Sequence, residues 1–212
     1  MENNEMMIQG EVLEVDESLS SASYQTAIMN PKAMNHLHKI AKTFSNSSML
    51  PAQYRGNVAN CFVACEMAAR MDVSPLFVMQ NLHVIEGRPS WSSSACIALI
   101  NGCGLFKDVR FNMVGEAGTP SRGCYVSATR ADTGEHVQGT TVTIQLAIDE
   151  GWMERKGSKW KTMPEQMLKY RAAAFFARIE CPNVLMGFML DDESRDIGAA
   201  ENNEKVKVQI NG

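Results

Sequence analysis

The chain has 212 residues, enough for one sizeable domain with tails, and its 45% hydrophobic content is ordinary for a globular protein. No apolar run approaches the ~18 residues that a membrane span requires, so we expect no membrane segment. The acidic N-terminus has no basic stretch ahead of an apolar one. It does not resemble a secretory signal, which makes the cytoplasm the expected location.

The net charge of −4 is distributed unevenly. Residues 1–30 hold six acidic residues and no Lys or Arg, and residues 191–212 hold six acidic and three basic ones. The stretch between them holds 17 basic and 12 acidic residues. A basic region between acidic ends favours a polyanionic partner. The expected domains are an acidic arm over 1–27, a core over 28–190 and an acidic tail over 191–212.

Helices are expected in the first part of the core. Asn30-Pro31 is a typical helix start, and this helix should end near Phe44. A second helix fits 51–71. Its expected apolar face recurs at steps of three and four residues and consists of Val58, Phe62, Cys65 and Ala69.

Strands are expected next, as a hairpin and a meander. Two short strands flank Glu86-Gly87-Arg88, and serines at 92–94 can cap a helix that runs to Ile100. Period-two alternation and the turn at 132–135 predict the meander. The expected hairpin strands are 82–85 and 89–91, and the expected meander strands are 106–114, 124–129 and 137–144.

Two helices follow, a short one over 145–151 and a long one from Met163-Pro164 to Glu180, which Pro182 stops. The whole order predicts an α+β fold. In it, a small, mainly antiparallel sheet made of the hairpin and the meander packs against several helices.

The cysteines form no C-x-x-C pair, and the four histidines are scattered, so no metal-ligand cluster is expected. We interpret the cysteines as small buried hydrophobic residues in a reducing compartment. They are Cys61, Cys65, Cys96, Cys103, Cys124 and Cys181.

Motifs of nucleotide and hydrolytic chemistry are missing from the sequence. Gly151 and Gly157 are not followed by G-K-[ST] at the required offset, and neither G-x-S-x-G nor H-E-x-x-H occurs. The acidic residues at 149–150 are interpreted as helix-end charge, and those at 191–193 as a solvated tail. We therefore expect no catalytic residues, no metal site and no required cofactor. No ATP requirement is expected, and any modulation by Mg²⁺ is expected to act through DNA.

The most informative segment is 152–178, which holds seven basic and two acidic residues. Binding a single strand without sequence preference requires cations along the phosphates and flat rings on which bases stack. Trp160 is either such a ring or a core residue, and we expect partial burial with one edge open to a DNA groove. The expected DNA-binding residues of this segment are Arg155, Lys156, Lys159, Trp160, Lys161, Lys169, Arg171 and Arg178. Lys107, Arg110 and Arg130 from the meander complete the set.

Helical geometry relates the cations of the last helix. Arg171 and Arg178, seven residues apart, share a face, whereas Lys169 lies about 200° from Arg171. Glu165 and Lys169 are spaced for a surface ion pair.

Three segments in this order resemble the RecT family of phage single-strand annealing proteins, relatives of Red-beta, over roughly 28–190. The first, Ala68 to Pro75, is similar to the family's A-A-R-M-G-L-x-P. The second is Gln80 with the hairpin and the helix that ends near Gly104. The third, Trp160 to Pro182, is similar to the family's pattern of Trp, Met, Lys, Arg pair, Lys and Pro. One departure is Ala174-Phe175, which stands where many relatives carry the Arg pair.

The resemblance implies an ATP-independent protein that binds single-stranded DNA and anneals complementary strands in phage homologous recombination. By position, Lys169 and Arg178 would bind DNA, and Arg171 would take part of the load of the missing Arg pair. The implied partners are single-stranded DNA, annealed duplex DNA, further copies of the chain in a ring or helical filament, a phage 5′–3′ exonuclease and the host single-strand-binding protein. The implied location is the bacterial cytoplasm.

Two functions of other classes stay open. A metal-dependent nuclease would use Asp132, Asp149 or Glu150, and its DNA degradation would be sensitive to chelators. A phage assembly or scaffold protein would use the basic segment against an acidic protein surface and would not bind oligonucleotides.

Overall fold

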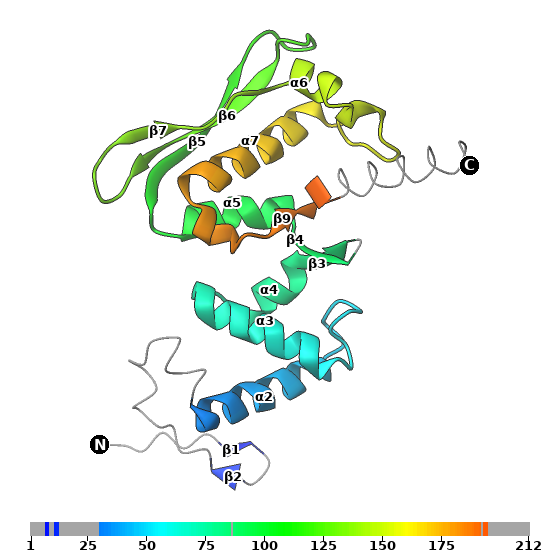
Figure 1. The fold of residues 1–212 in the computed structure, drawn as a ribbon, viewed down its shortest axis with the longest axis vertical. Coiled ribbons are helices and arrows are strands. Elements are labelled where there is room, and N and C mark those ends of the chain that lie inside the picture. The colour runs from blue at the N-terminus through cyan, green and yellow to red at the C-terminus, as the bar shows by residue number, and fades with distance from the viewer. Residues whose placement is uncertain (1–6, 9–10, 13–29, 86, 192, 195–212) are drawn as a thin grey trace, which may run out of the picture. The chain divides into compact units, whose positions relative to one another are not determined.

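The computed structural model describes residues 7–8, 11–12, 30–85, 87–191 and 193–194. The fold is α+β, as expected, and the chain forms two compact units, 1–80 and 81–212 (Figure 1). The expected core over 28–190 is thus shared between both units. Most of the predicted arm lies outside the described residues. Its strands β1 (Met7–Ile8) and β2 (Glu11–Val12) pair antiparallel.

Unit 1 is built on two helices that lie side by side, α2 (Pro31–Ser45) and α3 (Val58–Met71). The predicted start of α2 is confirmed, because the Asn30 side chain accepts the N–H of Lys32 at 2.9 Å. Helix α3 begins at 58 and not at 51. The reason is that turns occupy 52–56 and the Asn57 side chain caps the helix by accepting the N–H of Asn60 at 3.0 Å.

The apolar face predicted for α3 is confirmed only in part. Val58 and Phe62 are half-buried and Ala69 is exposed, whereas Cys65 is buried as expected. The buried stripe is displaced by one residue toward smaller side chains, which allow closer packing. It consists of Cys61, Ala64, Cys65, Met67 and Ala68. Asp72, at a φ of 54°, ends α3, and α4 (Pro75–Asn81) follows.

Unit 2 contains two sheets, so the hairpin and the meander do not form one sheet as predicted. The hairpin of β3 (Leu82–Ile85) and β4 (Arg88–Trp91) gains β9 (Met189–Leu190), which pairs parallel to β4. The meander contains β5 (Phe106–Val114), β6 (Gly123–Arg130) and β7 (His136–Gln138) in that order. The return strand predicted at 137–144 is divided, because β8 (Val142–Thr143) pairs separately with β6.

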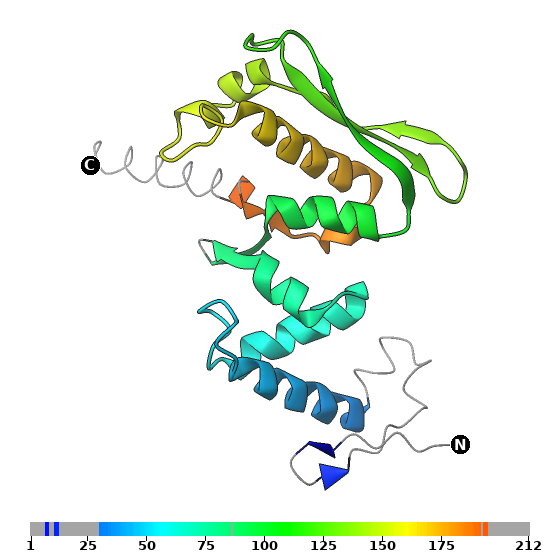
Figure 2. The same cartoon turned by 180° about the vertical axis from the view of Figure 1, so that it is seen from behind.

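Helical segments complete the described part of unit 2. They include α5 (Ser93–Gly102), α6 (Ile144–Asp149), the 3₁₀ helix η2 (Trp152–Glu154), α7 (Pro164–Glu180) and the 3₁₀ helix η3 (Pro182–Leu185). Helix α7 lies between the meander sheet and α5 in both ribbon views (Figures 1 and 2).

Aromatic side chains pack between these layers. The rings of Phe106 on β5 and Phe176 on α7 meet edge to face, with centroids 5.1 Å apart. Trp91 is fully buried, and its Nε1 donates to the carbonyl of Leu185 at 3.2 Å. Burying an indole while satisfying its N–H stabilises the contact between β4 and η3.

The cysteines behave as packing residues. All six are free thiols, and all but the half-buried Cys103 are buried. Burial raises the pKa of the Cys65 thiol to about 11 and that of Cys181 to about 12. Because a thiol must ionise to react, these two groups are unreactive near neutral pH.

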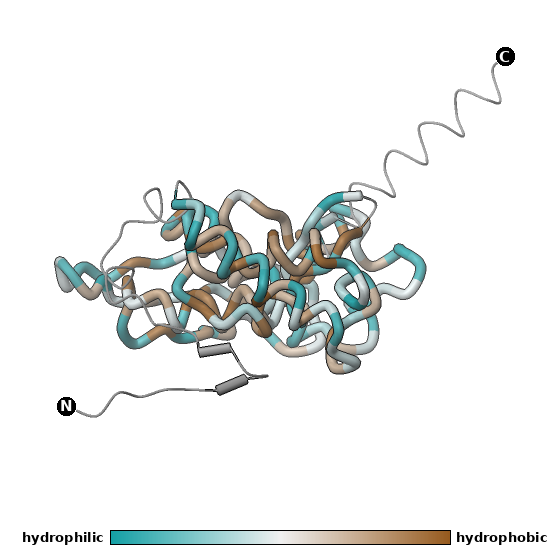
Figure 3. Tube along the Cα trace, turned by 90° about the horizontal axis from the view of Figure 1, so that it is seen from below, coloured by the Kyte–Doolittle hydropathy of each residue, from teal (hydrophilic) through white to brown (hydrophobic). Residues whose placement is uncertain are grey.

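No helix of the described residues is long and apolar enough to cross a membrane. The hydropathy-coloured trace agrees, since apolar and polar stretches alternate along the chain (Figure 3).

Gly139 generates the first prediction, because a Cβ there would lie 3.1 Å from Cδ2 of Phe176. Gly139→Ala should lower the free energy of unfolding by about 1–3 kcal/mol through overpacking against α7. Gly102→Ala is the control, since nothing lies within 4 Å of its Cβ position. It should be neutral or slightly stabilising. Equal denaturant midpoints for both variants would contradict the close packing of Gly139 against Phe176 of α7.

Candidate nucleic-acid interface

The loop before α7 is anchored by two indoles. Trp152 is 7% exposed and Trp160 is 3% exposed, and their ring centroids lie 5.4 Å apart with planes tilted by 30°. The expectation that Trp160 keeps one edge open to a groove is therefore wrong. Its ring packs on Trp152, which lies earlier in the same loop, so it acts as an anchor and not as a base-stacking platform.

Local hydrogen bonds shape the loop between the two indoles. The Ser158 hydroxyl donates to the carbonyl of Trp152 at 2.7 Å and accepts the N–H of Trp160 at 3.3 Å. Gly157 turns the chain with a φ of 77°. Both indoles are buried, whereas Lys156 and Lys159 between them are exposed. We call residues 155–161 the basic loop.

The cations of the basic loop differ in their partners. Lys156, Lys159 and Lys161 are exposed, and Arg155 is half-buried. Lys161 pairs with Glu154 at 2.9 Å. Among the described residues, neither Lys156 nor Lys159 has a carboxylate partner. These two lysines are therefore available to bind an anion in solution.

One face of α7 is directed at the meander sheet. Glu165 pairs with Arg122 at 2.7 Å, and Glu180 pairs with Arg130 at 2.6 Å. The ion pair predicted between Glu165 and Lys169 is wrong, because Arg122 takes that carboxylate. Lys169 is half-buried on the same face, and its charge acts to lower the pKa of the Cys124 thiol on β6, although burial raises that pKa overall.

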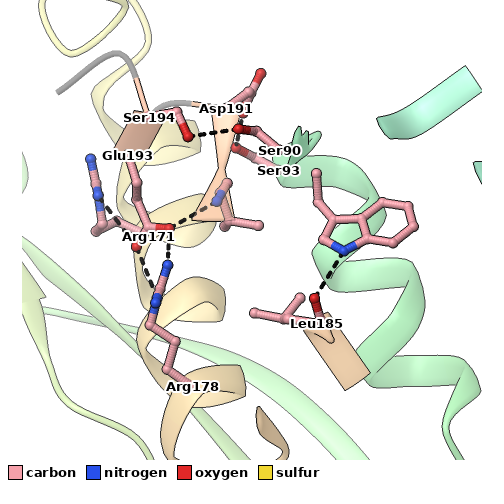
Figure 4. Close-up of polar contacts among 10 residues, drawn as sticks. Ser90, Ser93, Arg171, Arg178, Leu185, Asp191, Glu193 and Ser194 are labelled. Atoms are coloured by element: carbon pink, nitrogen blue, oxygen red, sulfur yellow. Dashed lines mark hydrogen bonds and ion pairs between the residues drawn. The ribbon is translucent and has the colours of Figure 1, made fainter. Parts of the chain in front are cut away.

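Arg171 and Arg178 share the other face of α7, as predicted, but both converge on a carboxylate. Arg171 is 3% exposed, and its guanidinium lies 4.1 Å from the centroid of the Trp152 ring. Its Nη1 is 3.8 Å from Oε1 of Glu193, and Nε of Arg178 donates to the same oxygen at 3.1 Å (Figure 4). Interpreting 193 as part of a solvated tail is wrong, since the Glu193 side chain is 13% exposed.

The meander sheet has one covered and one open face. Cys124, Val126 and Ala128 of β6 are fully buried on the α7 side. Tyr125 alternates with them and is half-buried on the other face, which no described element of unit 2 covers (Figures 1 and 2). In a sheet whose faces alternate, directly paired residues share a face. Asn112 pairs with Tyr125 and therefore lies on the open face too.

A β-bulge brings two cations to this open face. Lys107 and Arg110 are three apart and would point to opposite faces of a regular strand. The register shifts between them, with Asp108 at a φ of 54°, so that Lys107 pairs with Thr129 and Arg110 with Ser127. Both cations are exposed, and neither has a carboxylate partner among the described residues.

The predicted residues thus fall into two groups. Lys107, Arg110, Lys156 and Lys159 are exposed and have no carboxylate partner within the described chain. The remaining residues are buried, half-buried or engaged with a carboxylate: Arg130, Arg155, Trp160, Lys161, Lys169, Arg171 and Arg178. Sequence reasoning missed Tyr125 as a ring on the open face, although its alternation with Cys124 and Val126 placed it outside the core.

The acidic residues of the nuclease alternative are spread over separate turns and helix ends. Asp132 accepts the N–H of Thr133, and Asp149 accepts from the Gln145 amide, each at 2.8 Å. Asp132, Asp149 and Glu150 are all exposed. Within the described ranges, no three His, Cys, Asp or Glu side chains gather in a way that could hold a metal ion.

Comparisons of the chain with protein-family models, curated protein sequences and solved structures gave no match. The function must therefore be inferred from the residues and geometry described above.

Trp160 generates the second prediction. Trp160→Ala should lower the free energy of unfolding by ~3–5 kcal/mol, because it removes a buried ring that packs on Trp152. Trp160→Phe should be much milder, since it keeps an aromatic ring. Thermal unfolding followed by circular dichroism measures both. An Ala variant that melts like the wild type would show that the indole is not an anchor.

Proposed function

We propose that this protein binds single-stranded DNA and anneals complementary strands without a nucleotide cofactor, as a RecT-type single-strand annealing protein. The observation that carries the proposal is the basic loop, in which Lys156 and Lys159 stand exposed on a backbone anchored by Trp152 and Trp160. A loop held in shape by buried rings loses less conformational entropy when it binds phosphates than a mobile loop would.

The open sheet face supplies the second element that single-strand binding requires. Tyr125 offers a ring on which a base can stack. Arg110, diagonally across from it, and Lys107, further along the same face, add unneutralised charge. Tyr125 thus takes the role that the sequence suggested for Trp160. None of these contacts reads a base edge, so binding should be insensitive to sequence.

Annealing follows from contacts of this kind. A protein that holds a strand by its phosphates leaves the Watson–Crick edges free to pair with a second strand. Assembly into a ring or filament, the phage exonuclease, the host single-strand-binding protein and the bacterial cytoplasm belong to the same proposal. They rest on the resemblance to the RecT family.

Lysine substitutions in the basic loop test DNA binding. Lys156→Gln and Lys159→Gln should each weaken binding to an oligo(dT) strand and flatten the dependence of log K on log salt by ~0.7, since each phosphate contact releases about that many counterions. Lys161→Gln is the matched control in the same loop, because Glu154 already neutralises that lysine, and its effect should be smaller. Fluorescence anisotropy at several salt concentrations measures the slopes.

The lysine experiment also separates the alternatives. Unchanged slopes in both variants would remove the basic loop from the interface. A scaffold protein would not bind oligonucleotides in any of these titrations.

Cofactor independence is a separate prediction. Annealing of two complementary oligonucleotides should proceed at the same rate with and without ATP, and EDTA should not abolish it. A gel that resolves single strands from duplex measures it. An absolute requirement for ATP would contradict the family assignment, and chelator-sensitive loss of the strands would favour the nuclease.

A further inference from the structure

The carboxylate of Glu193 lies where two arginines of α7 converge. Arg178 donates to it through Nε and Nη2, one bond to each carboxylate oxygen. Arg171 approaches Oε1 of the same group. The N–H of Leu190 donates to Oε2 at 2.9 Å. One carboxylate therefore lies between two arginines, in the arrangement that arginines also offer to a phosphate.

One arginine of this pair is buried, and the other is partly exposed. The Arg171 side chain is 4% exposed and that of Glu193 is 13% exposed, whereas that of Arg178 is 40% exposed. An anion can thus approach along Arg178. Removing Glu193 with no replacement would leave the buried Arg171 guanidinium with less compensating charge, which is unfavourable. A second anion must therefore take the place of the carboxylate.

Hydrogen bonds to the start of α5 and to β4 hold the residues next to Glu193 in place. Ser194 bonds to Ser90 at 2.6 Å, and the Asp191 carboxylate accepts from Ser93 at 3.0 Å (Figure 4). Strand β9 pairs with β4 through only two residue positions, Ser90–Met189 and Trp91–Leu190. None of these contacts belongs to the backbone hydrogen bonding of α7 or of the meander sheet, so they can be exchanged for others without unfolding either element.

We infer that Arg171 and Arg178 form a binding site for a backbone phosphate of single-stranded nucleic acid, and that Glu193 occupies this site in the free protein. The inference rests on the proposed function. It adds that strand binding displaces the Glu193 carboxylate, so that this carboxylate competes with DNA for the two arginines. Because Arg171 also lies on the Trp152 ring, the exchange occurs beside the anchor of the basic loop.

Glu193→Gln tests the competition directly. The amide keeps an oxygen that can accept from Leu190 and the arginines but loses the charge, so oligo(dT) should bind about three- to tenfold more tightly than to the wild type. Ser194→Ala is the matched control. It loosens the same segment but leaves the Glu193 charge in place, so any gain in affinity should be smaller than that of the Gln variant. If the Gln variant does not fold, Glu193→Asp, which keeps the charge but is one methylene shorter, should change affinity in the same direction.

Two further readouts distinguish a phosphate site from a purely structural contact. Adding Arg178→Gln to Glu193→Gln should abolish the gain in affinity, because the arginine that would bind the phosphate is gone. In the wild type, oligo(dT) should accelerate hydrogen exchange at the Leu190 amide, whose acceptor is displaced. A static contact would leave that amide equally protected or more so.

The outcomes separate this inference from the proposed function. If Glu193→Gln binds like the wild type and Leu190 stays protected, while Lys159→Gln still weakens binding, the phosphate site is wrong and the proposed function stands. If the wild type binds no oligonucleotide even at low salt, both are wrong.

Discussion

The buried guanidinium of Arg171 is the group around which three segments of unit 2 pack. It is almost fully buried on α7, with the Trp152 ring on one side and the Glu193 carboxylate on another. A buried cation is unfavourable unless its charge is compensated, and a carboxylate together with an aromatic face provides that compensation. Arg171 thereby joins three segments that are distant in sequence: the start of the basic loop, the middle of α7 and the segment after β9.

This constraint explains why a uniformly basic stretch divides into different roles. Cations that lie on α7 or pack against it form ion pairs with carboxylates, as Arg178 does with Glu193 and Arg130 with Glu180. The cations that the indole anchor excludes from the interior, Lys156 and Lys159, acquire none among the described residues. In this described stretch, charge stays exposed where packing keeps a cation away from an internal carboxylate.

Packing also decides which charges are exposed on the meander sheet, and here it acts through strand register. Helix α7 takes the face formed by Cys124, Val126 and Ala128, so polar and charged side chains must use the opposite face. The bulge between Lys107 and Arg110 then brings both cations to the same face as Tyr125. A surface with charge and one ring results from strand register, and neither residue type nor spacing alone would produce it.

Local sequence signals determined much of this architecture. Caps, turn residues and periodicity predicted α2, β5 and α7 to within about one residue, because each of these depends on neighbours only a few positions away. They also predicted that Arg171 and Arg178 share a face, since helical geometry leaves no alternative. The α+β class followed from the order of these elements.

Only the tertiary structure decided which residues these elements meet. The parallel pairing of β9 with β4, the burial of Trp160 and the capture of two arginines by Glu193 all join positions far apart in the sequence. Such contacts depend on how the layers pack and on which carboxylate lies next to a buried cation. A local sequence pattern contains neither kind of information. The sequence by itself therefore determined where the positive charge lies along the chain. The fold decided which of that charge is neutralised inside the protein and which is left for a partner, because burial requires a counter-charge and exposure does not.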